Sequence, residues 1–428
     1  MAVVGAGFTG LWTAIELRRR APHLRVVVLE QGVVGYGASG RNGGFCEASL
    51  THGFANGLRH FPDEIEELER LGQENFQGLC DFVRDHAIAC DLETTGLLEV
   101  ATSAAQAEAL RLEHEARGRR GEDVRWLEGE ALASHLRSPL LTAGLRSTAG
   151  SALVNPARLA RGLARVAREQ GAAVHEQSRV TRMLPRAAGI ELRTAEGAVR
   201  ARRVVLATNA YSGQLLARLR RRFVPVYDYV LVSDPLTPPQ RERVGWAHRE
   251  GVADRGNHFH YFRLTADDRV LWGGYDAIYH FGGRVGPGYD HRPQTYRLLE
   301  SQFRAMFPAL ADLRFPHRWG GAIASTTRFT CTFGSAFGGR LTYALGYTGL
   351  GVAATRFAAR VLTDRLLAPA SPILRLRLVR QPPLPFPPEP LRTAALALVQ
   401  GAMTKADRTG RRGWLLTTLD RLGIGFDS

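Results

Sequence analysis

Three glycines near the start of the chain have the spacing of a phosphate-binding turn. Gly5, Gly7 and Gly10 follow a short apolar run at residues 2–4 and precede a helix with apolar periodicity. In this pattern the first glycine allows a tight turn, the second lets the backbone approach a pyrophosphate, and the third lets the helix lie close to the strand. The positive end of the helix dipole then attracts phosphate oxygens. The pattern predicts a dinucleotide site.

An acidic residue completes this pattern. A second apolar run at residues 26–29 ends in Glu30, whose carboxylate can accept hydrogen bonds from a ribose 2′-OH and would repel a 2′-phosphate. This argues against NADP but does not separate FAD from NAD. The alternative is a glycine-rich turn without a ligand, which the order strand, turn, helix, strand and acid disfavours.

Three later stretches have the character of ligand-contacting backbone. Residues 35–44 read GYGASGRNGG, a loop whose many glycines let the main chain approach a ligand closely. The apolar run RVVLA at 203–207 ends in Thr208 and Asn209, where a buried strand reaches the edge of its sheet. Residues 346–352 read GYTGLGV and lead directly into a predicted helix, with more glycine than a helix cap requires.

Taken in order, these motifs resemble a known family. GAGFTG with Glu30, GASGRNGG, RVVLATNAY, and WGGAIASTTR followed by ALGYTGLGV are similar to FAD-dependent oxidoreductases of the D-amino acid oxidase / glycine oxidase / sarcosine oxidase superfamily. The resemblance covers about residues 2–367 and looks closest to the γ-glutamylputrescine oxidase-like branch. It implies oxidation of a C–N bond of an amine or amino acid, with hydride transfer to flavin N5 and hydrolysis of the resulting imine.

The resemblance also implies roles for single residues. The first turn would hold the FAD pyrophosphate, Glu30 the adenosine ribose, and Val180 the adenine through its backbone. The second glycine loop would line the ribityl chain and isoalloxazine, and the late turn would place N–H groups at the flavin N1/C2 carbonyl, where reduced flavin is negative. The predicted FAD contacts are Gly5, Gly7, Gly10, Glu30, Ser39, Gly40, Arg41, Asn42, Gly43, Gly44, Val180, Thr208, Asn209, Gly346, Tyr347, Thr348, Gly349, Leu350, Gly351 and Val352.

Two departures from the family pattern narrow the chemistry. Ala324 stands where sarcosine-oxidase-like members carry the cysteine that links FAD, and Cys331 lies seven residues further on, so we expect non-covalent FAD. Glycine-oxidase-like members place a carboxylate-binding arginine near the same position. Here Arg328 is only close to it, which favours an amine over a simple α-amino acid.

Some relatives activate O2 with a lysine near the flavin, and Lys405 in the tail is the only lysine. The acceptor, O2 or another, therefore stays open.

Residues for the substrate side are few. Tyr261 and Arg263 share one face of a strand expected to face the flavin, and with Arg328 they are our catalytic candidates. The alternative reading is sheet packing for Tyr261 and an exposed ion pair for Arg263. His258 and His260 also share a face, but a metal site needs a third ligand, so we expect none.

The elements that position these residues indicate an α/β fold. We expect a Rossmann-like FAD-binding domain of the glutathione-reductase-like type 2 from residues 1–88, 151–222 and 319–368. A β-rich α+β substrate domain would comprise residues 89–150 and 223–318. We expect one amphipathic helix over 60–88. Residues 369–390 are proline-rich and predict an extended tether, and residues 391–422 predict two helices of a C-terminal extension that completes residues 369–428.

Composition sets the remaining limits. The net charge of +15 comes from scattered arginines without a basic tail, so we expect no nucleic-acid partner. An RNA-associated flavoprotein and an NAD-dependent dehydrogenase remain the alternatives.

Four cysteines without a CxxC pair favour a reducing, cytoplasmic location. No long apolar run predicts a membrane span, and no leader is expected. The first strand is short, which leaves open a start further upstream. Substrate identity and oligomeric state stay open.

Overall fold

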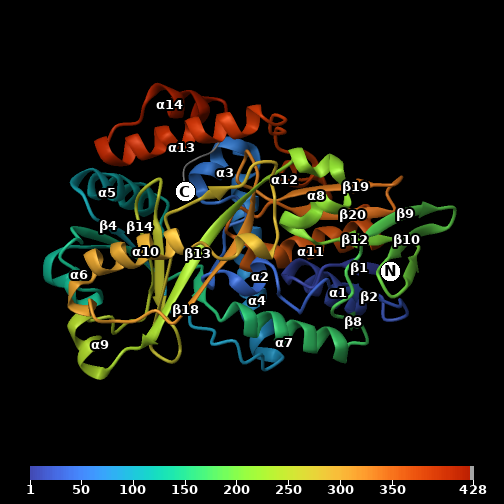
Figure 1. Ribbon diagram of the computed structural model, residues 1–428, viewed down its shortest axis with the longest axis horizontal. Helices are drawn as coiled ribbons and strands as arrows, with labels where there is room; N and C mark the ends of the chain where they lie inside the picture. Colours follow the sequence, from blue (N-terminus) through green and yellow to red (C-terminus); the bar gives the residue numbers. More distant parts are fainter. Residues whose placement is uncertain (425–428) are drawn as a thin grey trace.

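The computed structural model describes residues 1–424 and contains two main β-sheets (Figure 1). The first sheet has six strands in the order β19-β20-β12-β1-β2-β8. Five are parallel and β19 is antiparallel. This is the doubly wound α/β arrangement that the sequence predicts. Its strands are β1 (Ala2–Val4), β2 (Val27–Leu29), β8 (Ala173–His175), β12 (Val204–Leu206), β19 (Thr332–Ala336) and β20 (Leu341–Leu345).

Helices cover this sheet. Helix α1 (Phe8–Arg20) packs between α7 (Pro156–Glu169) and α11 (Gly351–Leu367), and α11 packs against α4 (Ile65–Asp85). The apolar residues of α1 are almost all buried, because strand β1 and both neighbouring helices surround it. Two small sheets are attached to this core. They are the antiparallel sheet of β9 (Arg182–Arg186), β10 (Gly189–Arg193) and β11 (Ala198–Ala201), and the pair β3 (Phe45–Glu47) and β7 (Ser151–Leu153).

The second main sheet has nine strands and is mostly antiparallel. Helix α10 (Pro293–Met306) packs on it, with Phe303 against Trp272 in an aromatic core. Helices α5 (Ala104–Arg119), α6 (Gly129–His135) and α9 (Pro238–Val244) surround its far end in Figure 1. Its strands are β4 (Leu97–Ala101), β5 (Val124–Leu127), β6 (Ala143–Ser147), β13 (Val224–Pro235), β14 (Gly251–Asp254), β15 (His260–Leu264), β16 (Arg269–Gly274), β17 (Ile278–Tyr279) and β18 (His317–Ser325).

The helix expected over residues 60–88 is α4, which is shorter than predicted and covers Ile65–Asp85. Helix α3 (Phe54–His60) ends at Phe61, a short 3₁₀ turn follows at Pro62–Glu64, and α4 starts at Ile65. Pro62 explains the break, because a proline disfavours helical geometry in the residue before it.

The proline-rich tether is also less extended than predicted. Residues Pro372–Arg375 and α12 (Arg377–Arg380) are helical. The carboxylate of Glu64 accepts hydrogen bonds from the backbone N–H of Arg377 at 2.9 and 2.8 Å, and Leu378 and Val379 are buried. These contacts anchor the segment to the core around α1 and α11, and the longest stretch without helix is residues 381–390.

The C-terminal extension forms the two predicted helices, α13 (Leu391–Thr409) and α14 (Trp414–Arg421). Figure 1 shows them across one edge of the molecule, above α3 and α5. Asp407 accepts hydrogen bonds from the backbone and side-chain N–H of Asn257 at 2.9 and 2.6 Å, and Gln400 donates to the carbonyl of Ala277. The extension is therefore docked on the nine-stranded sheet.

The sheets suggest one change in the domain boundaries. Strand β18 pairs with β13 over its whole length, from Ser325 opposite Val224 to His317 opposite Val232. We therefore place residues 319–325 with the proposed substrate domain and keep the other proposed boundaries. Within residues 1–424, no helix combines the length and apolar character that crossing a bilayer requires.

Candidate active site

A cavity of about 1200 Å³ lies where the six-stranded sheet meets the nine-stranded sheet. This exceeds the roughly 300–1,000 Å³ of an ordinary small-molecule site, which leaves room for a dinucleotide and a substrate together. Most of the residues predicted to contact FAD line it, although they come from widely separated segments. They are Gly5, Gly7, Glu30, Ser39, Arg41, Asn42, Gly43, Val180, Thr208, Asn209, Tyr347, Thr348, Gly349, Leu350, Gly351 and Val352.

The other four predicted contacts lie behind this surface. A Cβ atom on Gly10 would stand 1.9 Å from the carbonyl oxygen of Gly5, so its role is close packing of α1 on β1. Gly40, Gly44 and Gly346 are similarly confined, by Gly35, Val154 and Thr326 respectively. They allow the turns to form, while their neighbours contact the cavity.

Glu30 ties the first turn together. Its Oε2 accepts a hydrogen bond from the N–H of Ala6 at 2.8 Å and its Oε1 accepts one from Gly32 at 3.0 Å. Burial raises the pKa of Glu30, although these backbone hydrogen bonds oppose the rise. A carboxylate has about four acceptor positions, so two remain for hydroxyl donors in the cavity.

The late turn presents the N-terminus of α11 to the cavity. The side-chain oxygen of Asn209 accepts a hydrogen bond from the N–H of Gly346 at 2.9 Å, and the N–H of Thr348 donates to Ala324 at 3.1 Å. No side chain caps α11 and no acid lies in its first turn. Gly349 has a φ of +94° and faces open space. The first turn of α11 therefore suits a negatively charged ligand group. At α1 the N-cap side chain makes no cap either, but the Phe8 N–H donates to the Ser39 hydroxyl at 2.9 Å.

Asp228 and Tyr261 form the clearest polar pair on the substrate side. The Tyr261 hydroxyl donates to Oδ2 of Asp228 at 2.5 Å, and the Tyr229 N–H donates to Oδ1 at 2.8 Å. Burial raises the pKa of Asp228 to about 6 and that of Tyr261 well above its usual value. The Tyr261 ring lies against the backbone of Gly43, so the pair adjoins the glycine loop.

A family model described as FAD dependent oxidoreductase matches residues 1–365. The chain belongs to this family of FAD-dependent oxidoreductases. This assignment decides for FAD and against the NAD-dependent dehydrogenase alternative, and it makes the protein an enzyme of the amine or amino-acid oxidase type.

Similar proteins agree with this assignment. The chain is 30% identical over 377 residues to γ-glutamylputrescine oxidoreductase of Escherichia coli strain K12, covering 86% of this chain and 83% of that protein. Its fold is similar to that of glycine oxidase from Geobacillus kaustophilus, with a TM-score of 0.70, 23% identity, and coverage of 86% and 97%. Iminodiacetate oxidase from Chelativorans sp. BNC1 gives a TM-score of 0.70 at 19% identity, covering 88% and 98%.

Two of the catalytic candidates in this FAD-dependent oxidoreductase lie outside the cavity lining. Arg263 is 5% exposed and donates to the carbonyls of Gly43, Val154 and Leu264 at 2.6, 2.9 and 3.2 Å. It shares its strand face with Tyr261, as predicted, but the glycine-loop backbone covers it. Arg328 donates to Thr330 and to the carbonyl of Gln381 at 3.0 and 2.8 Å. Burial lowers the pKa of each arginine to about 10.

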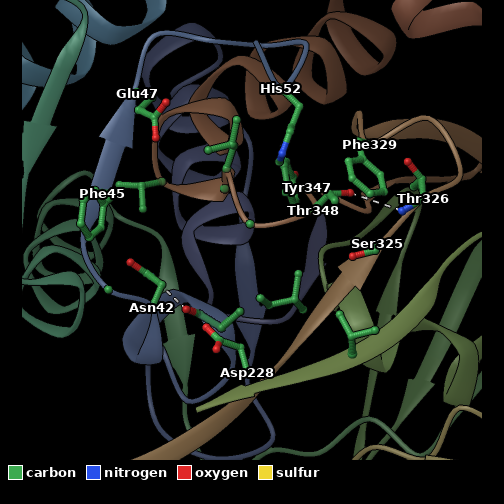
Figure 2. Close-up of a pocket in the computed structure, with 18 of the residues that line it drawn as sticks. Asn42, Phe45, Glu47, His52, Asp228, Ser325, Thr326, Phe329, Tyr347 and Thr348 are labelled. Atoms are coloured by element: carbon green, nitrogen blue, oxygen red, sulfur yellow. Dashed lines mark hydrogen bonds between the residues drawn. The ribbon is translucent and has the colours of Figure 1, made fainter. Parts of the chain in front are cut away.

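The sequence reasoning missed residues on two other walls. Phe45 and Glu47 of β3 line one side of the pocket, across from His52, Phe329 and Tyr347 (Figure 2). In the run FCE, directly after the glycine loop, Phe45 and Glu47 share one strand face, and this alternation could have indicated that they line the site. The wall supplied by α13 had no such signal, because amphipathic periodicity does not reveal which surface a helix covers. Its lining residues are Leu396, Val399, Gln400 and Met403.

The histidines of HFHYFRL do not converge on a metal site. His258 pairs with Asp407 at 2.8 Å and His260 with Asp254 at 2.7 Å. A different group, His135, His248 and Glu250, has ligand atoms within 4.8 Å of one another, outside the cavity lining. No motif in the sequence indicates this group. Glu250 is fully buried, and its Oε1 lies 2.8 Å from His135 Nδ1 and accepts from Arg146 at 2.9 Å, whereas His248 is exposed. We therefore interpret Glu250 as the structural partner of His135 and Arg146.

Proposed function

We propose that this enzyme oxidises the C–N bond of an amine, releasing an imine that water hydrolyses. When bound, FAD supplies the hydride acceptor at flavin N5. The observation that carries the proposal is that the Asp228–Tyr261 pair and the predicted FAD-contacting segments line one continuous cavity.

Asp228 would bind and orient the reacting amine. A carboxylate with a pKa of about 6 is largely ionised at neutral pH and attracts an ammonium group, whose proton it can accept as the neutral amine forms. The hydrogen bond from Tyr261 fixes the orientation of Oδ2, which keeps the amine aligned with the glycine loop. Tyr261 is therefore proposed as a positioning residue.

Helix α13 would limit the access of water. Its apolar residues Leu396, Val399 and Met403 line the cavity, and Asp407 and Gln400 hold the helix in place. Exclusion of water strengthens the attraction between Asp228 and an ammonium group, because the effective dielectric constant falls.

The proposed substrate class is an amine and not a simple α-amino acid. Arg328, the arginine nearest to the predicted carboxylate-binding position, lies outside the cavity lining and is engaged by Thr330 and Gln381. The similarity to a γ-glutamylputrescine oxidoreductase supports the same choice. We propose O2 or another carrier as the electron acceptor.

Non-covalent FAD also remains our proposal. Ala324 is completely buried in β18, and Cys331 lies outside the main cavity lining, with a pKa raised to about 12 by burial. A thiol with that pKa is a poor nucleophile. All four cysteines are buried free thiols, which supports a reducing, cytoplasmic location. We propose no nucleic-acid partner.

The test is anaerobic bleaching of the bound flavin. Polyamines, N-methyl amino acids and D-amino acids are mixed with the holoenzyme without oxygen, and active compounds are repeated in air. We expect amines to bleach the flavin and Asp228→Asn to slow bleaching. The conservative Tyr261→Phe should weaken the alignment of Asp228 and slow bleaching less. Absence of bleaching by every amine would refute the proposal, and reoxidation in air would separate an oxidase from a dehydrogenase.

A further inference from the structure

Glu47 is a carboxylate that the proposed chemistry leaves without a role. Strand β3 turns Cys46 into the core and turns Phe45 and Glu47 towards the cavity. Within residues 1–424, Glu47 has no side-chain hydrogen bond and no ion pair with another residue. Burial raises the pKa of Glu47, and the guanidinium of Arg117 opposes this only partly. The Glu47 side chain is half-buried and opens on the cavity, so its oxygens can accept hydrogen bonds from a ligand there.

The surroundings of Glu47 are rich in further carboxylates. Glu99 and Glu113 line the same cavity, and both share the guanidinium groups of Arg117 and Arg255. Arg117 is also 2.8 Å from Glu122, so its charge is divided among several acids. Burial and the neighbouring acids raise the pKa of Glu99 to about 7.

The whole cavity has the same bias. Nine carboxylate side chains and six arginines line it, although the chain has a formal net charge of +15. A local excess of acid favours a cation in the part of the cavity near these carboxylates.

The position of Glu47 fits a second charge on the substrate. Glu47 lies four positions after Gly43, whose backbone touches Tyr261, so the two main-chain positions are at most about 14 Å apart. Phe45 and the residues Leu396, Val399 and Met403 of α13 supply apolar lining in the same cavity. An aliphatic chain with a cation at each end matches a cavity that combines two carboxylates with apolar lining.

We infer that the substrate is a diamine or polyamine, with one amine at Asp228 and a second ammonium group bound by Glu47. This rests on the proposed function, since Asp228 orients the amine that is oxidised. Glu47 is then a specificity-determining residue, because a monoamine or an α-amino acid without a side-chain amine has no second cation to pair with the Glu47 carboxylate.

Putrescine and butylamine test this directly, because they differ by the second amino group. The dissociation constant of each is measured with the FAD-loaded enzyme, by calorimetry and by anaerobic flavin reduction. A hydrogen-bonded charge pair should make wild type prefer putrescine by roughly 10- to 100-fold. Glu47→Gln should lose this preference and leave butylamine unchanged. Glu47→Asp should retain part of the preference.

Glu74→Gln is the matched control, because it removes one negative charge at an exposed site on α4 outside the cavity lining. It should keep the preference. Glu47→Gln removes no hydrogen bond or ion pair within residues 1–424, so its thermal stability should equal or exceed that of wild type. Equal affinity of wild type for the two amines, or an unchanged preference in Glu47→Gln, would overturn the inference even if amines bleach the flavin. Glu47-dependent putrescine binding without bleaching would instead refute the proposed oxidation and leave the cation site standing.

Discussion

Replacing Glu30 should weaken FAD binding, and each variant should weaken it more the more hydrogen bonds to the ribose it removes. Both carboxylate oxygens are tied to backbone N–H groups, at 2.8 and 3.0 Å, and each has one acceptor position left for a ribose hydroxyl. A net hydrogen bond to a charged group contributes about 1.5–3 kcal/mol. Loss of two such bonds in Glu30→Ala therefore corresponds to about 3–6 kcal/mol, or roughly a 10²- to 10⁴-fold rise in the FAD dissociation constant.

The smaller change to Glu30→Gln keeps one oxygen acceptor and removes the charge, so its effect should be about 10-fold. FAD is titrated into flavin-free protein and binding is followed by fluorescence quenching, with Glu169→Gln on the exposed end of α7 as the control. Glu30→Arg should retain the least FAD, because it places a buried cation beside the N–H groups of Ala6 and Gly32. Dissociation constants within twofold of wild type for both Gln and Ala variants would place the ribose acceptor elsewhere.

Four further outcomes follow from the structure. Gly10→Ala puts a Cβ atom 1.9 Å from the Gly5 carbonyl oxygen. The free energy of unfolding should therefore fall by roughly 3 kcal/mol or more, and the protein should retain less FAD. An unchanged melting temperature would contradict the packing argument. Burial raises the pKa of Asp228 from 3.8 to about 6, so the stability contribution of its neutral form is complete below pH 3.8 and lost as pH rises through 6. As pH rises from 3.8 to 7, the free energy of unfolding of Asp228→Asn should therefore increase relative to that of wild type by up to about 3 kcal/mol, and by less where cavity water screens the charge. If the two proteins differ in urea midpoint by the same amount at pH 3.8 and at pH 7, the argument is wrong. Asp407→Asn should loosen α13 and speed protease cleavage within residues 381–390 without loss of FAD, whereas an unchanged cleavage rate would show that other contacts hold the helix. Acid precipitation should leave FAD in the supernatant, and flavin in the pellet would disprove non-covalent binding.

The glycine turns that line the cavity can be predicted from the sequence because their signals are local. Gly5, Gly7 and Glu30 lie within one strand–helix–strand unit, and glycine spacing reflects backbone geometry directly. The turn at 346–352 is as local, and its sequence already shows the glycines that a left-handed φ requires.

The substrate half depends on contacts between distant strands, which alternation alone cannot assign. Asp228 and Tyr261 are brought together by β13, β16 and β15, and nothing in either strand shows that they pair. Arg263 has the same alternation as Tyr261, yet the backbone of Gly43 and Val154 covers it. Glu47 and α13 meet at the cavity only because the whole chain has folded.

The strand order of the first sheet has a consequence for biosynthesis. Strand β1 is synthesised before the strands that complete its side of the sheet, because β12 and β20 begin at residues 204 and 341. The N-terminus of α11, which closes the cavity, comes later still, at Gly351. At roughly 5–20 residues per second, synthesis of the chain from β1 to Gly351 takes about 20–70 s. During this interval the nascent chain exposes an incomplete phosphate-binding turn, and FAD can be retained only after Gly351 has been synthesised.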